Sequence, residues 1–178
     1  DNYEAGSVHI VGADDFEGLE EQRFMVHGRG NSSWGTFRKK PSYTFKLDKA
    51  QEVGGMPAHK KWVMIGNYRD KTLLRNQVAM ELGRVTNLEW VPRGVQVELV
   101  KNGTHRGTYL LSEQIRIDEN RLDINEMHIE DVNEPAITGG YVLEIDRYGD
   151  SDTYTFNSIC MTGTLFFVLI LKNIIYLF

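Results

Sequence analysis

The sequence predicts an α+β domain: an antiparallel sheet accompanied by one principal helix. Several short segments alternate apolar and polar residues, as half-buried strands do. Two of these segments are joined by Asn102-Gly103, a pair that is typical of a two-residue hairpin turn. Helical spacing between a cap and a stop is found over residues 72–82. Strands that pair through hairpins, beside a separate helix, indicate the α+β class.

Each predicted strand depends on a local pattern. Tyr43, Phe45 and Leu47 fall on one face of a strand, with Thr44 and Lys46 on the other. Val95 to Val100 alternates in the same way before the hairpin turn. The strands are predicted over residues 7–11, 21–27, 43–47, 62–65, 95–100, 108–113 and 140–146. Residues 50–60 contain two glycines and a proline and are predicted to be a loop.

The predicted helix can be capped by Asp70 or Thr72 and stopped by Gly83. Its apolar residues form a broad arc that we expect to be buried, made of Leu73, Leu74, Val78, Met80 and Leu82. Glu81 falls within this arc. It either pairs with Lys40 or Lys46 in a buried position or is an exposed residue near the helix end.

Composition excludes several classes of function. The chain has 178 residues and a formal net charge of -5, which argues against a general nucleic-acid-binding surface. The single cysteine, Cys160, excludes an intramolecular disulfide and a zinc site made of several cysteines. The five histidines show no i, i+4 pairing, so no metal site is predicted from them.

The two ends of the chain differ from the rest. The sequence begins at Asp1 without a methionine, so we expect the true start to lie upstream. An apolar run begins at Leu165 and is interrupted by Lys172-Asn173, which makes it short of the roughly 20 apolar residues that span a bilayer. We therefore expect a domain over residues 1–158, with 159–178 as a tail. The tail is either non-native or a buried terminal strand or helix, and a membrane segment is the third and weakest alternative.

An anion-binding turn is indicated between residues 27 and 47. Gly28, Gly30 and Gly35 permit backbone geometry in which N–H groups converge on an anion. Positive charge is added by Arg29, Arg38, Lys39 and Lys40. The turn matches neither the P-loop nor the G-x-G-x-x-G motif, and a hairpin with a solvated basic face is the alternative.

Several separated stretches of the chain share an order and spacing that point to one family. They are Gly28-Arg29-Gly30-Asn31-Ser32-Ser33-Trp34, Lys39-Lys40-Pro41-Ser42-Tyr43, Lys61-Trp62-Val63-Met64, the set Asn67, Asp70, Thr72, Leu74, Arg75 and Asn76, then Asn102-Gly103, Gly107-Thr108-Tyr109-Leu110-Leu111-Ser112-Glu113-Gln114-Ile115, Asn120-Arg121, and Gly139-Gly140-Tyr141-Val142-Leu143-Glu144-Ile145-Asp146. Together, over about residues 20–148, they resemble the CotH (spore coat protein H) kinase family.

The resemblance implies an atypical protein-kinase-like fold, here mainly the N-terminal lobe. It also implies transfer of the γ-phosphoryl group of ATP to Ser or Thr of a protein substrate, with Mg²⁺ or Mn²⁺. An exported, cell-surface or spore-coat location in bacteria is expected, without nucleic acid as a partner. The residues it implies for nucleotide binding are Arg29, Asn31, Lys40, Lys46, Arg75 and Glu113, with Lys40 favoured as the phosphate-pairing lysine.

The chain departs from the family after Asp146, where Asp150-Ser151-Asp152 and the apolar tail follow. No match to the family's catalytic or metal-binding acids is found, so we expect a domain truncated within its C-terminal lobe and inactive by itself. The alternative is a non-catalytic coat or surface scaffold that keeps the fold. A weaker alternative is a carbohydrate-associated module that stacks sugars on Trp34, Trp62 and Trp90, although tryptophans are more often core residues.

Overall fold

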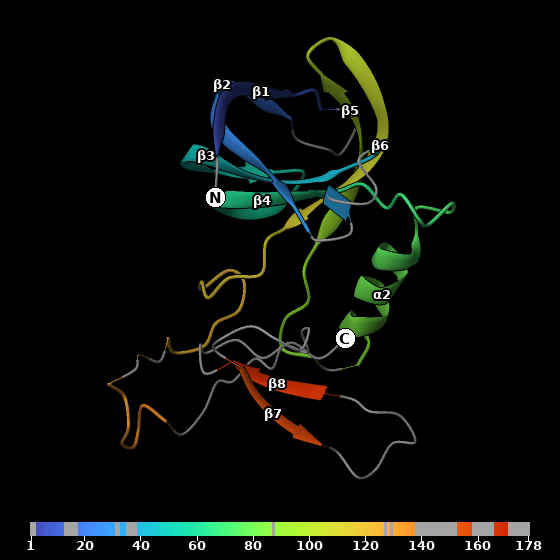
Figure 1. Ribbon diagram of the computed structural model, residues 1–178. Coiled ribbons are helices and arrows are strands. Elements are labelled where there is room, and N and C mark those ends of the chain that lie inside the picture. The colour runs from blue at the N-terminus through green and yellow to red at the C-terminus, as the bar shows by residue number, and fades with distance from the viewer. Residues whose placement is uncertain are drawn as a thin grey trace. The chain divides into compact units, whose positions relative to one another are not determined.

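The computed structural model describes residues 3–12, 18–30, 33–34, 39–86, 88–126, 128, 130–137, 153–157 and 166–170, the last two ranges by their backbone only. The chain divides into two compact units, Asp1–Arg116 and Ile117–Phe178 (Figure 1). The candidate functional site lies wholly within the first unit.

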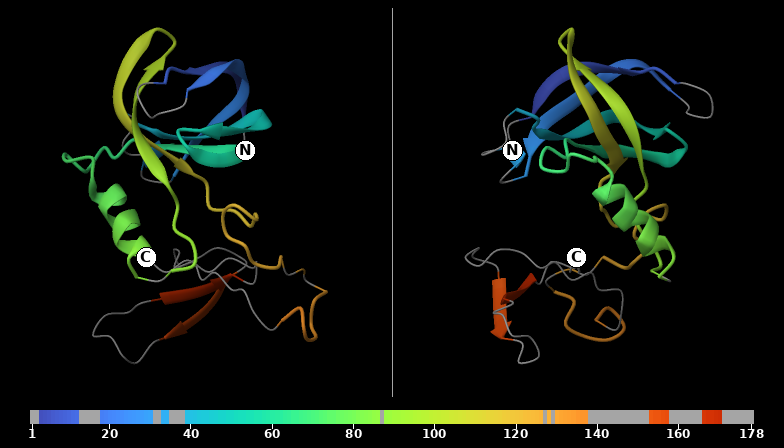
Figure 2. Two further views of the ribbon diagram at one scale, coloured as in Figure 1. Left: turned by 180° about the vertical axis from the view of Figure 1, so that it is seen from behind. Right: turned by 90° about the vertical axis from the view of Figure 1, so that its right-hand side faces the viewer.

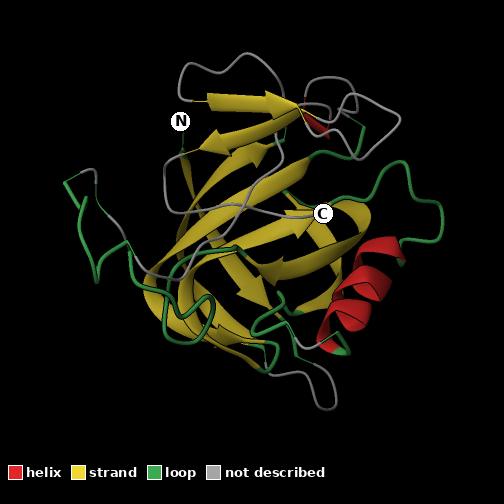
Figure 3. Cartoon of the chain, turned by 90° about the horizontal axis from the view of Figure 1, so that it is seen from below, coloured by secondary structure: helices red, strands yellow, loops and turns green. Residues whose placement is uncertain are grey.

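The first unit is built on a six-stranded antiparallel sheet with the order β1-β2-β3-β4-β6-β5. Figure 2 shows that the sheet is strongly curved. The strands are β1 (Glu4–Ile10), β2 (Leu19–Arg29), β3 (Ser42–Val53), β4 (Met56–Ile65), β5 (Gly94–Lys101) and β6 (Thr104–Glu113). One helix, α2 (Arg75–Arg84), connects β4 to β5 and lies at one flank of the sheet (Figure 3). The expectation of an antiparallel sheet with one principal helix is confirmed.

The core lies on one face of this sheet because apolar residues of neighbouring strands share the same register. Phe24 is opposite Leu47, and Phe45 lies between Val26 on β2 and Trp62 on β4. The cluster is completed by buried residues from both ends of the sheet, Leu19, Val53, Met56 and Leu111. Trp62 is therefore a core residue and no stacking platform.

Two tight turns set the length of the strands. Asn102 and Gly103 both have positive φ, 50° and 71°, as the predicted hairpin turn requires. Gly54 and Gly55 also have positive φ and join β3 directly to β4. The prediction of a loop over residues 50–60 is wrong, because the two glycines make a short hairpin turn and the flanking strands continue on both sides.

The helix begins later than predicted, and it exposes the side that was predicted to be buried. It runs from Arg75 to Arg84, so Gly83 lies within it instead of ending it. A Cβ added to Gly83 would lie 3.0 Å from the Val91 side chain. The predicted burial of the apolar arc is wrong, since Leu74, Val78 and Leu82 are 50%, 51% and 60% exposed. The side that faces the sheet carries Gln77 instead. Its side-chain oxygen Oε1 accepts a hydrogen bond of 3.3 Å from the Gln96 side-chain amide on β5.

Glu81 takes the exposed position that was one of its two alternatives. Its side chain is exposed and forms an ion pair with Arg84 within the same helix. It therefore does not pair with Lys40 or Lys46.

The second unit contains an isolated bridge between Ile117 and Leu122 and a two-stranded antiparallel sheet of β7 (Thr153–Asn157) and β8 (Phe166–Ile170). Part of the apolar tail is thus a strand. The predicted strand over residues 140–146 lies outside the described residues. In the described part of the chain, no helix is both long and apolar enough to cross a bilayer.

Candidate functional site

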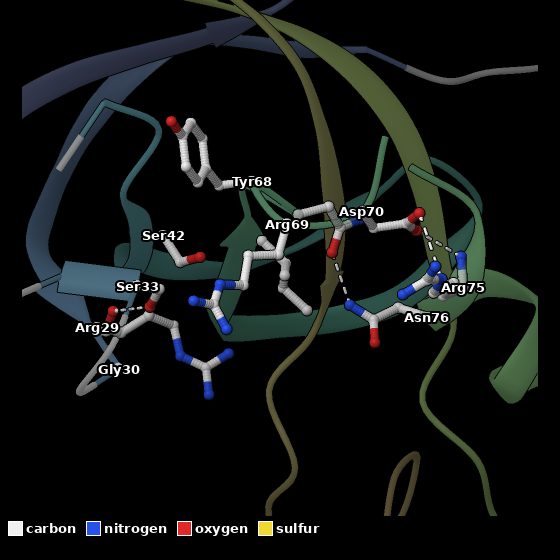
Figure 4. Close-up of a pocket in the computed structure, with 11 residues that line it drawn as sticks. Arg29, Gly30, Ser33, Ser42, Tyr68, Arg69, Asp70, Arg75 and Asn76 are labelled. Carbon is white, nitrogen blue, oxygen red and sulfur yellow. Dashed lines mark hydrogen bonds and ion pairs between the residues drawn. The ribbon is translucent and has the colours of Figure 1, made fainter. Parts of the chain in front are cut away.

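A cavity of about 450 Å³ opens at the strand ends where β2 ends and β3 begins. Figure 4 shows side chains from these strand ends and from the segment before α2 pointing into it. Three arginines, Arg29, Arg69 and Arg75, are its most polar lining residues. The lining is completed by Gly30, Ser33, Ser42, Ile65, Asn67, Tyr68, Asp70 and Asn76.

The turn after β2 places Arg29. Gly30 has φ +83°, a backbone conformation that glycine adopts without the steric cost other residues carry. The Ser33 hydroxyl donates a hydrogen bond of 2.9 Å to the Arg29 carbonyl oxygen, and the Trp34 N–H donates one of 3.3 Å to that of Gly30. These two bonds fold the chain back immediately after β2, so Arg29 stands at the rim of the cavity (Figure 4).

The segment between β4 and α2 places the other two arginines. The Asp70 N–H donates to the Asn67 carbonyl oxygen over 2.9 Å, which closes a tight turn with Tyr68 and Arg69 at its tip. In Figure 4 the guanidinium groups of Arg69 and Arg29 point toward the same space. Arg75 begins α2, and its Nε lies 3.6 Å from the Asp70 carboxylate.

Positive charge dominates the cavity. The described lining residues include three arginines and one carboxylate, Asp70, which pairs with Arg75. This carboxylate accepts hydrogen bonds from the Thr72 hydroxyl, the Thr72 N–H and the Arg75 N–H. The bond from the Thr72 hydroxyl is the largest of the causes that lower the pKa of Asp70 below its usual value of 3.8. Asp70 is therefore ionised at neutral pH, and its lone pairs are directed at the protein rather than at the cavity.

The structure brings together only part of the predicted nucleotide-binding set. Arg29 and Arg75 line the same cavity, and Asn31 lies outside the described residues. Sequence reasoning did not single out Arg69, although it stands between Asn67 and Asp70, two residues that carried the family resemblance. Its place at the tip of a tight turn is the signal that points to it.

Lys40, the lysine favoured as the phosphate partner, does not line the cavity, although its carbonyl oxygen lies beside Gly66, which stands in sequence between two of the lining residues. Its ammonium nitrogen is 5.3 Å from the centre of the Tyr109 ring. Burial lowers the pKa of Lys40, an effect that the nearby Glu98 carboxylate opposes. Lys40 is thus engaged in a cation–π contact on the sheet.

Lys46 lies on β3 directly opposite Lys61 on β4. Alternation along β3 puts Lys46 on the same face as Ser42, which pairs with Arg29. Burial, and then the charges of Arg116 and Lys46, lower the pKa of Lys61. Lys46 does not line the cavity but shares the sheet face on which the cavity opens.

Glu113 is fully engaged in the interior. Its side chain is 0% exposed, and Arg93 donates three hydrogen bonds to its carboxylate, from the backbone N–H and from two guanidinium nitrogens. It does not line the cavity.

The described residues contain no group of three or more His, Cys, Asp or Glu side chains that could hold a metal ion. Asp70, the carboxylate of the cavity, has both oxygens committed to Thr72 and Arg75. This part of the chain therefore does not fit a metal centre.

The fold and the cavity together define a curved antiparallel-sheet domain with an arginine-lined cavity where β2 ends and β3 begins. The family model described as CotH kinase protein matches residues 26–159. Because the match covers most of the sequence, the chain belongs to the CotH kinase family. Neither the curated proteins nor the solved structures include a match to it.

Proposed function

We propose that this chain carries the nucleotide-binding part of an atypical protein kinase, with the phosphate groups of ATP in the arginine-lined cavity. The observation that carries the proposal is that Arg29, Arg69 and Arg75 line one cavity, with the guanidinium groups of Arg29 and Arg69 pointing toward the same space (Figure 4). Membership of the CotH kinase family supports a kinase-type function. The proposed reaction transfers the γ-phosphoryl group to Ser or Thr of a protein substrate, in an exported, cell-surface or spore-coat setting.

The chemistry of the three arginines suits this role. A guanidinium group is always charged and presents its N–H donors in a planar fork that matches two phosphate oxygens. In phosphoryl transfer the protein acts mainly by positioning the phosphates and stabilising charge on the transferred group. Arg29 and Arg69, whose guanidinium groups point toward the same space, would grip one phosphate from two sides (Figure 4).

The order of elements supports a kinase-like N-terminal lobe. In protein kinases a glycine-rich loop covers the phosphates, and a lysine on the sheet contacts them. Here the glycine-containing turn joins β2 to β3, and the helix follows β4. Lys46 stands four residues beyond Ser42 on the same face, roughly 13 Å along the strand at about 3.3 Å per residue. At that distance Lys46 does not reach phosphates bound in the cavity, and the ammonium group of Lys40 contacts Tyr109, so we assign the pairing of phosphate charge to the cavity arginines.

A divalent cation, Mg²⁺ or Mn²⁺, would neutralise phosphate charge when it enters with the nucleotide. Its protein ligands would come from residues beyond those described. Within the described cavity, the chain's own contribution is to bind and orient the phosphates.

The test is titration of the full chain and its variants with a non-hydrolysable ATP analogue. Charge-assisted hydrogen bonds contribute about 1.5–3 kcal/mol each. Arg29→Ala and Arg69→Ala should therefore each weaken binding by about tenfold or more. Arg23→Ala is the matched control, because Arg23 belongs to β2 and does not line the cavity. Equal binding in all three variants would favour the non-catalytic scaffold over the kinase.

A further inference from the structure

Asp70 uses all its hydrogen-bonding groups to shape the segment that carries Arg69 and Arg75. Its N–H closes the turn that begins at Asn67, and its carbonyl oxygen accepts from the Leu73 N–H over 3.1 Å, which closes a second turn. Its carboxylate accepts from the Thr72 N–H at 3.0 Å, the Thr72 hydroxyl at 2.6 Å and the Arg75 N–H at 2.9 Å. The side chain thus caps α2 from outside the helix.

Two residues of this segment, Asn67 and Leu73, have positive φ and need support. Leu73 has φ +61°, which costs an L residue with a bulky side chain roughly 1–2 kcal/mol. Its carbonyl oxygen accepts from the side-chain amides of Asn67 and Gln96, and Asn76 in turn donates to Asn67 over 2.7 Å. A strained residue persists only where its surroundings hold it, and such residues gather at functional sites.

The held segment brings two like charges to one cavity. Arg69 precedes Asp70 directly, Arg75 follows it by five residues, and both line the cavity. Asp70 is nearly buried, at 9% exposure, and its Oδ1 lies 3.6 Å from Arg75 Nε. Arg75 is otherwise a highly exposed side chain. The Asp70 carboxylate contacts both the side chain and the backbone N–H of Arg75.

We infer that Asp70 is a positioning residue for the phosphate-bearing ligand: it fixes the double turn over residues 67–75 so that Arg69 and Arg75 face the cavity together. The inference rests on the proposed function. It assigns to an acidic residue a favourable effect on the binding of an anion, which is opposite to its direct Coulombic effect.

That difference in sign makes the test sharp. Asp70→Asn removes a negative charge beside the cavity, so a purely Coulombic role predicts tighter binding of the ATP analogue. The positioning role predicts binding about tenfold weaker. In an Arg69→Ala/Arg75→Ala background the same substitution should change binding less than about twofold, because both side chains through which Asp70 acts are then absent.

Thr72→Val keeps the test decisive where Asp70→Asn fails to fold. Thr72 is uncharged and does not line the cavity, yet its hydroxyl donates to Asp70 over 2.6 Å and accepts from the Leu74 N–H over a longer 3.3 Å. An effect of Thr72→Val on binding would therefore act through the turn that Asp70 holds and not through a direct contact with the ligand. We expect about threefold weaker binding. Thr86→Val is the matched control, since Thr86 donates a comparable bond to Gly83 at the other end of α2 and should leave binding unchanged.

The possible results separate the two proposals. If Arg29→Ala and Arg75→Ala weaken binding while Asp70→Asn tightens it or leaves it unchanged, the positioning role is overturned and the proposed function stands. Unchanged binding in Thr72→Val likewise overturns the positioning role. If neither arginine variant affects binding, the proposed function itself fails.

Discussion

Arg93 holds both carboxylate oxygens of Glu113. Its Nη2 lies 2.8 Å from Oε1, while its Nε and its backbone N–H lie 3.1 Å and 2.8 Å from Oε2. The Glu113 N–H in turn donates to the Arg93 carbonyl oxygen over 3.1 Å. The Glu113 side chain is wholly buried and the Arg93 side chain is 38% exposed. The pair joins the entry to β5 with the end of β6. This relationship gives Glu113 a structural role in the sheet.

Arg93→Ala should strongly destabilise the domain. The substitution leaves the Glu113 carboxylate buried without its charged partner, a loss that typically costs about 3–5 kcal/mol. Urea unfolding followed by fluorescence measures the change. Arg84→Ala is the control, because its partner Glu81 is exposed and such pairs contribute about 1 kcal/mol or less. Equal losses in the two variants would contradict the structural role of Glu113.

Gly66→Ala should destabilise the junction between β4 and the segment that carries the arginines. A Cβ at this position would lie 2.5 Å from the Lys40 carbonyl oxygen, and backbone atoms cannot move aside as a flexible side chain can. Overpacking of this kind costs about 1–3 kcal/mol. Chemical denaturation measures it.

Gly55→Asn provides the comparison for Gly66→Ala. Gly55 has φ +72°, and a Cβ added there would meet no other atom within 4 Å. Asparagine tolerates this backbone conformation better than most residues do. The change in unfolding free energy at Gly55 should therefore be smaller. A larger loss at Gly55 than at Gly66 would refute the close approach of Gly66 to Lys40.

Lys61→Met should stabilise the domain at neutral pH. Lys61 lies directly opposite Lys46, and like charges across a strand pair are destabilising by a few tenths to about 1 kcal/mol. Because the pKa of Lys61 is lowered in the folded state, the folded chain releases this proton before the unfolded chain does as pH rises. Stability of the unsubstituted chain should therefore recover as pH approaches the ordinary lysine value of 10.5, and the advantage of Lys61→Met should shrink.

Urea midpoints at about pH 7 and about pH 10, each at low and at high salt, check this prediction. Salt should also reduce the advantage, because it screens the repulsion between exposed charges. Lys60→Met is the control, since Lys60 is exposed and lies on the opposite face of β4. An advantage that is independent of both pH and salt would mean that the gain comes from apolar packing instead.

Much of the sheet could be predicted because strand patterns are local. Tyr43, Phe45 and Leu47 show their common face in sequence, and Asn102-Gly103 specifies its turn by two residues that tolerate positive φ. The extension of β3 and β4 through residues 50–60 could not be separated from a loop, because Gly54-Gly55 fits both. The side of α2 that faces the sheet could not be predicted either, because an apolar arc in the sequence does not show which element packs against the helix. Here Gln77 is hydrogen-bonded to Gln96 on β5, while Leu74, Val78 and Leu82 are exposed.

The cavity was only partly predictable for a related reason. Arg29 could be recognised from its glycine-containing turn. The place of Arg69 depends on a turn closed by Asn67 and Asp70, and that of Lys40 on Tyr109, which is distant in sequence. Basic residues that are clustered in sequence thus separate in the fold, and an arginine from another segment takes the place expected for a lysine.

The most direct measurement is a calorimetric comparison of ATP and adenosine binding to the full chain and to the double variant Arg29→Ala/Arg69→Ala. If the arginines grip the phosphates, the double variant should lose about a hundredfold or more in affinity for ATP while any affinity for adenosine is unchanged. Equal affinity of the two proteins for ATP would contradict the proposed phosphate site.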